Sequence, residues 1–294
     1  MAAQNTSSQD SLIPTPTADH TPANAHPFPN SYSFDAPDAL MKLDKSLKEI
    51  SGLTLLDEQR LAAVQDEKGK LYIINARNGE ISTDRRFAKD GDFEGIELAG
   101  DLLYALRSDG DLYEISDWDT KDPDTEKFET HLGSKNDTEG LTYDAMNNRL
   151  LIVCKEQPGA GLKNARAVYS FDLSTKKMSK DPVLVIDLKA VEALTEKNKL
   201  NSIVRNLAAP LTNLSGFKPA GLAIHPITGQ LFIISSVRKV ILAYNMDGTL
   251  EDVWLLPEDD FRQPEGLAFL PNGDLFIANE GGNGAATLMR FNYK

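Results

Sequence analysis

A short motif ending in Gly-Leu or Gly-Ile occurs five times along the 294-residue chain. The copies are Ile50-Ser51-Gly52-Leu53, Phe93-Glu94-Gly95-Ile96, Thr138-Glu139-Gly140-Leu141, Pro219-Ala220-Gly221-Leu222 and Pro264-Glu265-Gly266-Leu267. Most successive glycines are separated by about 45 residues, and one gap is about twice as long. A repeat of this period indicates one supersecondary unit copied around an axis or along a stack.

Each copy is followed by four short runs of β-forming residues. In the first repeat these runs are separated by turn residues such as Asn78-Gly79, and they are Leu53–Leu56, Arg60–Val64, Lys70–Ile74 and Glu80–Thr83. Four short strands in about 45 residues are typical of a β-propeller blade. The hydrophobic fraction of 41% is sufficient for a packed core. The sequence therefore predicts an all-β propeller with four-stranded blades.

The two ends of the chain indicate how the ring closes. The last repeat reaches Lys294 without a fourth strand, whereas Tyr32–Phe34 and Ala39–Leu43 precede the first repeat and have no blade of their own. An N-terminal strand that completed the last blade would remove two exposed strand edges. We therefore expect the N-terminal strand to close the last blade.

The long gap between the third and fourth motifs predicts an insertion. Pro182–Ile186 supplies a fourth strand for the third repeat, and the apolar residues of 188–208 are spaced as in an amphipathic helix. These apolar residues include Val191, Leu194, Leu200, Ile203, Val204 and Leu207. We predict five blades with a helical insertion near 188–215, and six blades remain the alternative.

Residues 1–30 differ in composition from the rest. They contain five of the fifteen prolines, no Lys or Arg and no apolar stretch, which is typical of a disordered leader or tether. This segment lacks the basic start and hydrophobic core of a signal peptide. No apolar run approaches the ~20 residues of a transmembrane helix. We expect a leader over 1–30 and the propeller over 31–294, without a transmembrane segment.

Charge, cysteine and histidine content exclude several classes of function. A net charge of −13 argues against nucleic acid as a partner. The single Cys154 lies in an apolar run, so it forms no internal disulfide and is expected to be a buried structural thiol. There is no nucleophile elbow, zinc-protease or phosphate-loop motif, and the four histidines are not placed as catalytic bases. Catalytic residues therefore stay unknown, and we expect a monomer.

Propeller topology brings the motif starts and the ends of the second strands to one face, which we call the axial mouth. The insertion leaves the third blade from the same face, so we also expect it near the mouth. The residues at these positions are mostly charged, and they differ from blade to blade as a ligand site requires. The predicted ligand-binding residues are Glu94, Glu139, Glu265, Arg107, Lys155, Asp66 and Glu280.

The mouth residues allow three interpretations. Glu94, Glu139 and Glu265 supply hard oxygen ligands, so Ca²⁺ or Mg²⁺ is a possible cofactor. Alternatively, Arg107 and Lys155 neutralise the carboxylates and hold an anionic or zwitterionic ligand. In the third interpretation the glutamates hydrogen-bond neighbouring blades and serve only the structure.

Several motifs, in order, resemble the SdiA-regulated (YjiK-like) family over residues 30–294. They are Gln65-Asp66-Glu67-Lys68-Gly69, Phe93-Glu94-Gly95-Ile96, Leu106-Arg107-Ser108-Asp109-Gly110, Asp137-Thr138-Glu139-Gly140-Leu141, Phe217-Lys218-Pro219-Ala220-Gly221-Leu222, Gln263-Pro264-Glu265-Gly266-Leu267 and Ala278-Asn279-Glu280-Gly281. The resemblance implies a bacterial β-propeller of the cell envelope. A more distant similarity to phytase-like and esterase-like propellers, some of them calcium-bearing, implies metal-dependent hydrolysis as an alternative.

The leading hypothesis is a propeller whose mouth binds a small ligand, a cation or a protein partner. The alternative is a Ca²⁺- or Mg²⁺-dependent hydrolase of phosphoesters, esters or lactones, in which the cation activates water. A purely structural scaffold is the second alternative.

Overall fold

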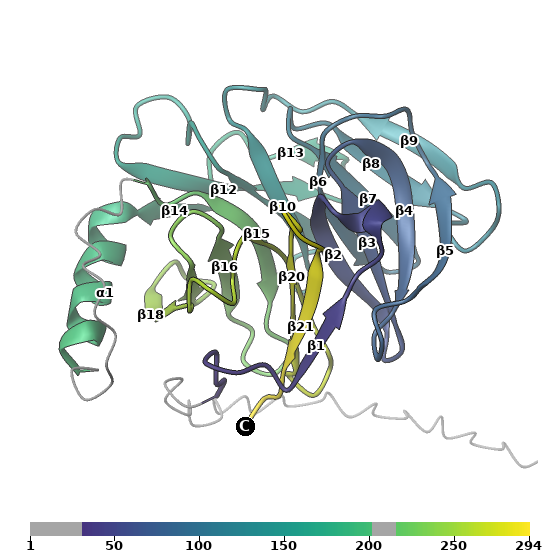
Figure 1. The fold of residues 1–294 in the computed structure, drawn as a ribbon. Helices are drawn as coiled ribbons and strands as arrows, with labels where there is room; N and C mark the ends of the chain where they lie inside the picture. Colours follow the sequence, from purple (N-terminus) through teal and green to yellow (C-terminus); the bar gives the residue numbers. More distant parts are fainter. Residues whose placement is uncertain (1–30, 202–215) are drawn as a thin grey trace, which may run out of the picture.

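The chain folds into a ring of five antiparallel sheets, each forming one blade of a β-propeller (Figure 1). The computed structural model describes residues 31–201 and 216–294. The predicted leader over 1–30 and the insertion residues beyond 201, including Ile203, Val204 and Leu207, lie outside the described residues. The prediction of a five-bladed, all-β fold is confirmed.

The blades follow one another along the chain, and each runs from an inner strand outward. Blade one is β2 (Ile50–Asp57), β3 (Arg60–Gln65), β4 (Lys68–Asn75) and β5 (Ile81–Arg86). Blade two is β6 (Phe93–Ala99), β7 (Leu102–Arg107), β8 (Leu112–Ser116) and β9 (Asp124–Phe128). Blade three is β10 (Thr138–Asp144), β11 (Arg149–Cys154), β12 (Ala165–Asp172), β13 (Lys177–Met178) and β14 (Leu184–Asp187). Blade four is β15 (Pro219–Ile224), β16 (Leu231–Ser235), β17 (Val240–Tyr244) and β18 (Leu250–Leu255).

Blade five joins the two ends of the chain, as predicted. It consists of β19 (Pro264–Phe269), β20 (Leu275–Asn279), β21 (Thr287–Phe291) and the N-terminal strand β1 (Ala39–Lys42). Strand β1 pairs antiparallel with β21, with Ala39 opposite Arg290 (Figure 1). A short 3₁₀ helix (Lys45–Leu47) then leads into blade one.

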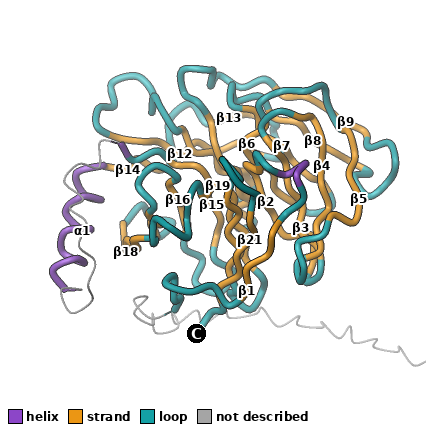
Figure 2. Tube along the Cα trace, in the orientation of Figure 1, coloured by secondary structure: helices purple, strands orange, loops and turns teal. Residues whose placement is uncertain are grey.

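The insertion begins as predicted but packs differently. The helix α1 (Leu188–Asn201) starts directly after β14, which supplies an outer strand of blade three. We expected the insertion near the mouth. Instead, the described part of α1 packs against β18 at the outer edge of blade four, and Leu188 and Val191 are buried there with Val253 (Figure 2). No helix among the described residues is long and apolar enough to cross a membrane.

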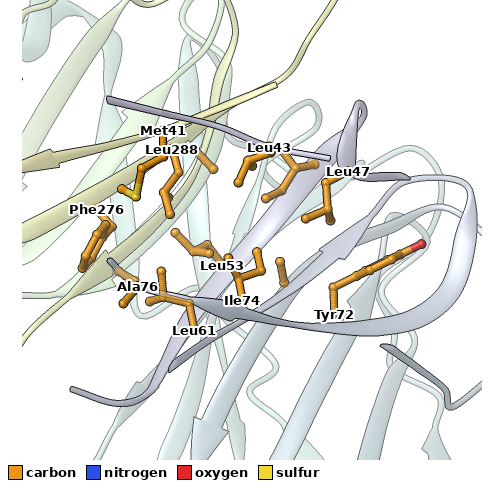
Figure 3. Close-up of a cluster of buried hydrophobic side chains, with 14 of the residues drawn as sticks. Met41, Leu43, Leu47, Leu53, Leu61, Tyr72, Ile74, Ala76, Phe276 and Leu288 are labelled. Atoms are coloured by element: carbon orange, nitrogen blue, oxygen red, sulfur yellow. The ribbon is translucent and has the colours of Figure 1, made fainter. Parts of the chain in front are cut away.

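The core consists of five hydrophobic clusters, one between each pair of neighbouring blades. A central strand such as β11 is buried on both faces, which explains its continuous apolar run Leu150–Val153. Leu150 and Ile152 face blade two, whereas Leu151 and Val153 face blade four. Figure 3 shows the cluster between blades five and one, where Phe276 and Leu288 pack with Leu61. Closing the ring therefore completes the fifth cluster.

The five motif glycines lie against the inner strand of the next blade, all the way round the ring. A Cβ atom on Gly95 would lie 2.9 Å from Leu141 Cβ, and one on Gly266 would lie 2.7 Å from Leu53 Cβ. A Cβ on Gly221 would collide with the carbonyl oxygen of Glu265. Glycine is required here because the neighbouring backbones leave no space for a side chain.

Replacing Gly221 by Ala should therefore destabilise the propeller. We expect Gly221→Ala to lower the free energy of unfolding by about 1–3 kcal/mol, since overpacking against backbone cannot be relieved by a rotamer change. Denaturant titration of the purified variant measures this loss. Gly133→Ala is the control, because a Cβ on Gly133 meets nothing within 4 Å and its φ is not positive. Equal stability of the two variants would contradict the close packing of the inner strands.

On the face opposite the mouth, a buried histidine attaches the N-terminal segment to the ring. His225 is fully buried, and its Nδ1 accepts hydrogen bonds from the amides of Ile227 and Thr228, both at 3.2 Å. Its Nε2 therefore carries the proton and donates it to the Tyr32 hydroxyl at 2.8 Å, and that hydroxyl donates to the Gly273 carbonyl at 2.5 Å. Burial lowers the pKa of His225 to about 4.

The neutral state of His225 predicts a loss of stability in acid. In the unfolded chain this residue takes up a proton below about pH 6.5, whereas the folded protein resists protonation down to about pH 4. Stability therefore decreases as the pH falls through this window, by up to about 3 kcal/mol. Denaturant titrations at pH 7 and pH 4 should show that His225→Gln removes most of this contribution. The exposed His131→Gln variant should keep the wild-type pH profile, and a wild-type profile in His225→Gln would contradict the assignment.

Candidate functional site

A β-bulge in each inner strand coincides with the Gly motif. The strand register shifts at Ile50/Leu53, Phe93/Gly95, Glu139/Leu141, Pro219/Gly221 and Pro264/Leu267. A bulge inserts an extra residue and re-aims the neighbouring side chain. Below this level the glycines and the Leu or Ile residues after them leave an axial space of only about 10 Å³. The axial channel is therefore nearly filled at this level, and the mouth is the face of the ring on which the inner strands begin.

Lys155 and Glu139 form an ion pair in the mouth. Lys155 Nζ is 2.5 Å from Glu139 Oε1, and the Glu139 side chain is 2% exposed. Burial lowers the pKa of Lys155, but the negative charges of Glu139, Asp137 and Glu265 outweigh burial and hold this pKa above its usual range. Lys155 is therefore charged at every physiological pH.

Three glutamates from three blades interact with this ammonium group and with one another. Burial raises the pKa values of Glu94, Glu139 and Glu265. The charge of Glu139 raises the pKa of Glu94 further, and the charge of Glu94 raises that of Glu265. The positive charge of Lys155 acts in the opposite direction on all three. The Lys155 ammonium, with a further interaction between Lys239 and Glu265, does not compensate three buried carboxylates, so the group retains protons near neutral pH.

Two further predicted residues extend the acidic group toward blades five and one. Burial, together with the charges of Glu49 and Asp66, raises the pKa of Glu280 to about 7. Burial and the charge of Glu49 raise the pKa of Asp66 to about 6. Asp66 Oδ1 is buried and has no hydrogen-bond partner among the described residues. These two carboxyl groups are thus poorly compensated as well.

The structure brings six of the seven predicted residues into one electrostatic group and leaves Arg107 out. The Arg107 guanidinium contacts Asp109 and Asp111, the latter at 3.7 Å, and lies 3.2 Å from the Tyr113 hydroxyl. Arg107 is the last residue of β7, whereas Lys155 follows the last residue of its own strand. Because side chains alternate along a strand, this offset of one residue turns Arg107 away from the mouth. The expectation that Arg107 neutralises the mouth carboxylates is therefore wrong.

The candidate set from the sequence omitted four residues that act on the mouth. Asp137 interacts electrostatically with Lys155 and Glu139, and the Gln263 side chain hydrogen-bonds Glu265 and Glu280. The other two are Asp92, which acts on Glu94, and Glu49, which acts on Glu280 and Asp66. All four stand three positions before a motif glycine. This regular place in the repeat is the signal that could have identified them.

Within residues 31–201 and 216–294, no three His, Cys, Asp or Glu side chains are grouped so that they could hold a metal ion. Glu139, one of the three predicted metal ligands, pairs instead with the Lys155 ammonium. Cys154 next to it is fully buried, and burial raises the pKa of its thiol to about 12, so it is a structural thiol as predicted.

The family model for SdiA-regulated proteins matches residues 32–283, which include blades one to four, strands β1, β19 and β20 of blade five, and every mouth residue. The chain belongs to the SdiA-regulated family. No curated relative matches it.

Solved structures similar to this one share the fold at low sequence identity. A glutaminyl cyclase from Myxococcus xanthus aligns with a TM-score of 0.56 at 13% identity, over 88% of this chain and 96% of that one. A nidogen/laminin complex aligns with a TM-score of 0.50 at 14% identity, over 81% of this chain and 74% of that one. At such identities the similarity describes the fold and transfers no activity.

The raised pKa values predict that the mouth carboxyl groups lower the stability of the folded protein at alkaline pH. A carboxyl group whose pKa is raised by folding ionises more easily in the unfolded chain, so stability is lost as the pH rises from about 4.5 through the folded pKa. Glu265→Gln should therefore raise the melting temperature by a few degrees at pH 9 and leave it unchanged at pH 4. Thermal unfolding followed by circular dichroism measures both values.

The exposed Glu58, in the β2–β3 turn on the opposite face, provides the matched control. Glu58→Gln should have the same melting temperature as the wild type at both pH values. A Glu265→Gln variant that is destabilised at pH 9 would show that Glu265 is a compensated structural carboxylate.

Proposed function

We propose that the axial mouth binds a small cationic ligand, either a divalent metal ion or an organic amine. The observation that carries this proposal is the buried group formed by Glu94, Glu139 and Glu265, in which, among the described residues, only Lys155 forms an ion pair and Lys239 adds a weaker electrostatic interaction with Glu265. A ligand cation would supply the missing positive charge and lower the pKa values of these carboxyl groups. Binding would then release protons.

The arrangement of the acidic residues supports a small ligand. Glu94, Glu139 and Glu265 come from three separate blades and act on one another electrostatically, so one compact cation would interact with several of them. Carboxylate oxygens suit both hard metal ions and ammonium groups. The ion pair of Lys155 with Glu139 would shift or rearrange to admit a metal ion, whereas an amine can bind beside it.

A metal-dependent hydrolase is the alternative, in which the bound cation would activate water. It requires that Ca²⁺ or Mg²⁺ assemble a ligand set that the described side chains do not form by themselves. The location in the cell envelope and the monomeric state stay predictions.

Calorimetry with defined probes tests the proposal. CaCl₂, MgCl₂ and putrescine are titrated into the protein at pH 7 in two buffers of different ionisation enthalpy, which gives the affinity and the number of protons released. We expect at least one probe to bind with proton release. Glu265→Gln should weaken its binding tenfold or more, because a charged contact contributes about 1.5–3 kcal/mol.

Glu58→Gln should bind the same probe as the wild type does. Binding of Ca²⁺ or Mg²⁺ but not putrescine would assign the site to metal ions. Binding that is unchanged in Glu265→Gln, or no binding of any probe, would overturn the proposal and favour the structural scaffold.

A further inference from the structure

A second cavity opens beside the mouth, between the loop that precedes β19 and one face of blade five. Its volume is about 460 Å³, and we call it the blade-five groove. Its floor consists of two rows across the sheet, Asn279–Thr287–Lys42 and Met289–Leu40, because these residues are paired in register. Asp259, Asp260 and Arg262 of the loop line the other side, and Glu280 joins the groove to the mouth.

The most unusual residue of this groove is Asn279. Its side chain is 2% exposed, and neither its amide nitrogen nor its amide oxygen has a hydrogen-bond partner among the described residues. Leaving a buried polar group unpaired costs about 1–3 kcal/mol. A buried amide whose N–H donor and carbonyl acceptor both lack a hydrogen-bond partner therefore needs an explanation.

Equivalent positions in other blades have a structural task. Gln65, at the end of the second strand of blade one, accepts a hydrogen bond from the Lys68 amide at 2.8 Å. Ser235, at the same place in blade four, accepts one from the Lys218 amide at 3.2 Å. Of Gln65, Ser235 and Asn279, only the Asn279 side chain has no hydrogen-bond partner among the described residues.

Exposed charged side chains of both signs also line the groove. Across the described ranges, no ion pair involves Lys42, Arg262, Asp259 or Asp260. A larger cavity of about 620 Å³ beside blade one differs only in part. There, Lys68 and Arg86 both pair with Asp90, whereas no ion pair among the described residues involves Lys45 or Glu67.

We propose that the blade-five groove binds a short peptide whose backbone amide hydrogen-bonds the Asn279 side chain. A peptide group presents one donor and one acceptor, which are the two functions that Asn279 leaves free. The opposite charges of the groove suit the two termini of a peptide. Leu40 is 61% exposed beside the buried Met289 and offers an apolar contact for a peptide side chain.

This inference goes beyond cation binding at the mouth, with which the groove shares only Glu280. The two sites are separable because Asn279 takes no part in the acidic group, and Glu265 does not line the groove.

The test uses the full chain and the tripeptide alanyl-leucyl-alanine as the probe. Titration followed by NMR should shift the side-chain amide signals of Asn279 and saturate. The analogue with an ester in place of the central amide has nearly the same shape but lacks the N–H donor, and it should bind at least tenfold more weakly. Unchanged Asn279 signals on addition of the tripeptide would overturn the proposal.

The Asn279→Leu variant should no longer bind the tripeptide. It should be at least as stable as the wild type, because an apolar group of similar size replaces an amide without hydrogen-bond partners. The exposed Asn292→Leu variant, at the other end of β21, should bind the tripeptide normally. A marked loss of stability in Asn279→Leu would show that the amide already has hydrogen-bond partners in the free protein. Full binding of the tripeptide by this variant would exclude the groove as its binding site.

Thr287→Val is the second variant, and it should weaken tripeptide binding without affecting any cation bound at the mouth.

Discussion

The contact between each motif glycine and the backbone of the next blade is the constraint on which the rest of this structure depends. Gly52 lies against the backbone of Gly95 and Ile96, and the same relation is repeated around the ring until Gly266 meets Leu53. A single side chain at this level would hold two blades apart. Because the inner strands approach so closely, the axial channel is nearly filled at this level and the hydrophobic clusters between blades can pack to the axis.

The same local geometry creates the mouth. The bulge that brings the glycine to its neighbour also sets the direction of the preceding side chain, and in blades two, three and five that residue is a glutamate of the acidic group. Where that residue is Glu, carboxyl groups crowd into a partly dehydrated space. Converging acids of this kind reduce stability, so the mouth carries a cost that the interblade clusters must offset.

Much of this architecture could be predicted from the sequence because repeats encode it directly. The period identified the blades, and the unmatched strands at both ends identified the closure. The predictions failed where the direction of a side chain depends on an offset of one residue, or where the position of an element depends on a tertiary contact. Arg107 ends its strand and faces between blades, whereas Lys155 stands one position later and faces the mouth. The direction of α1 depends on the surface that β18 offers, and the idle amide of Asn279 appears only when its neighbours are placed in space.

The two faces of the ring respond to pH in opposite directions. On one face, a buried neutral His225 resists protonation, so acid weakens the attachment of the N-terminal segment through Tyr32. On the other face, the buried carboxyl groups around Lys155 resist ionisation, so alkali weakens the fold there. Stability is therefore highest between these limits. A cation bound at the mouth would change only the loss of stability in alkali, because only those carboxyl groups gain a partner. The loss of stability in acid would be the same with and without the bound cation.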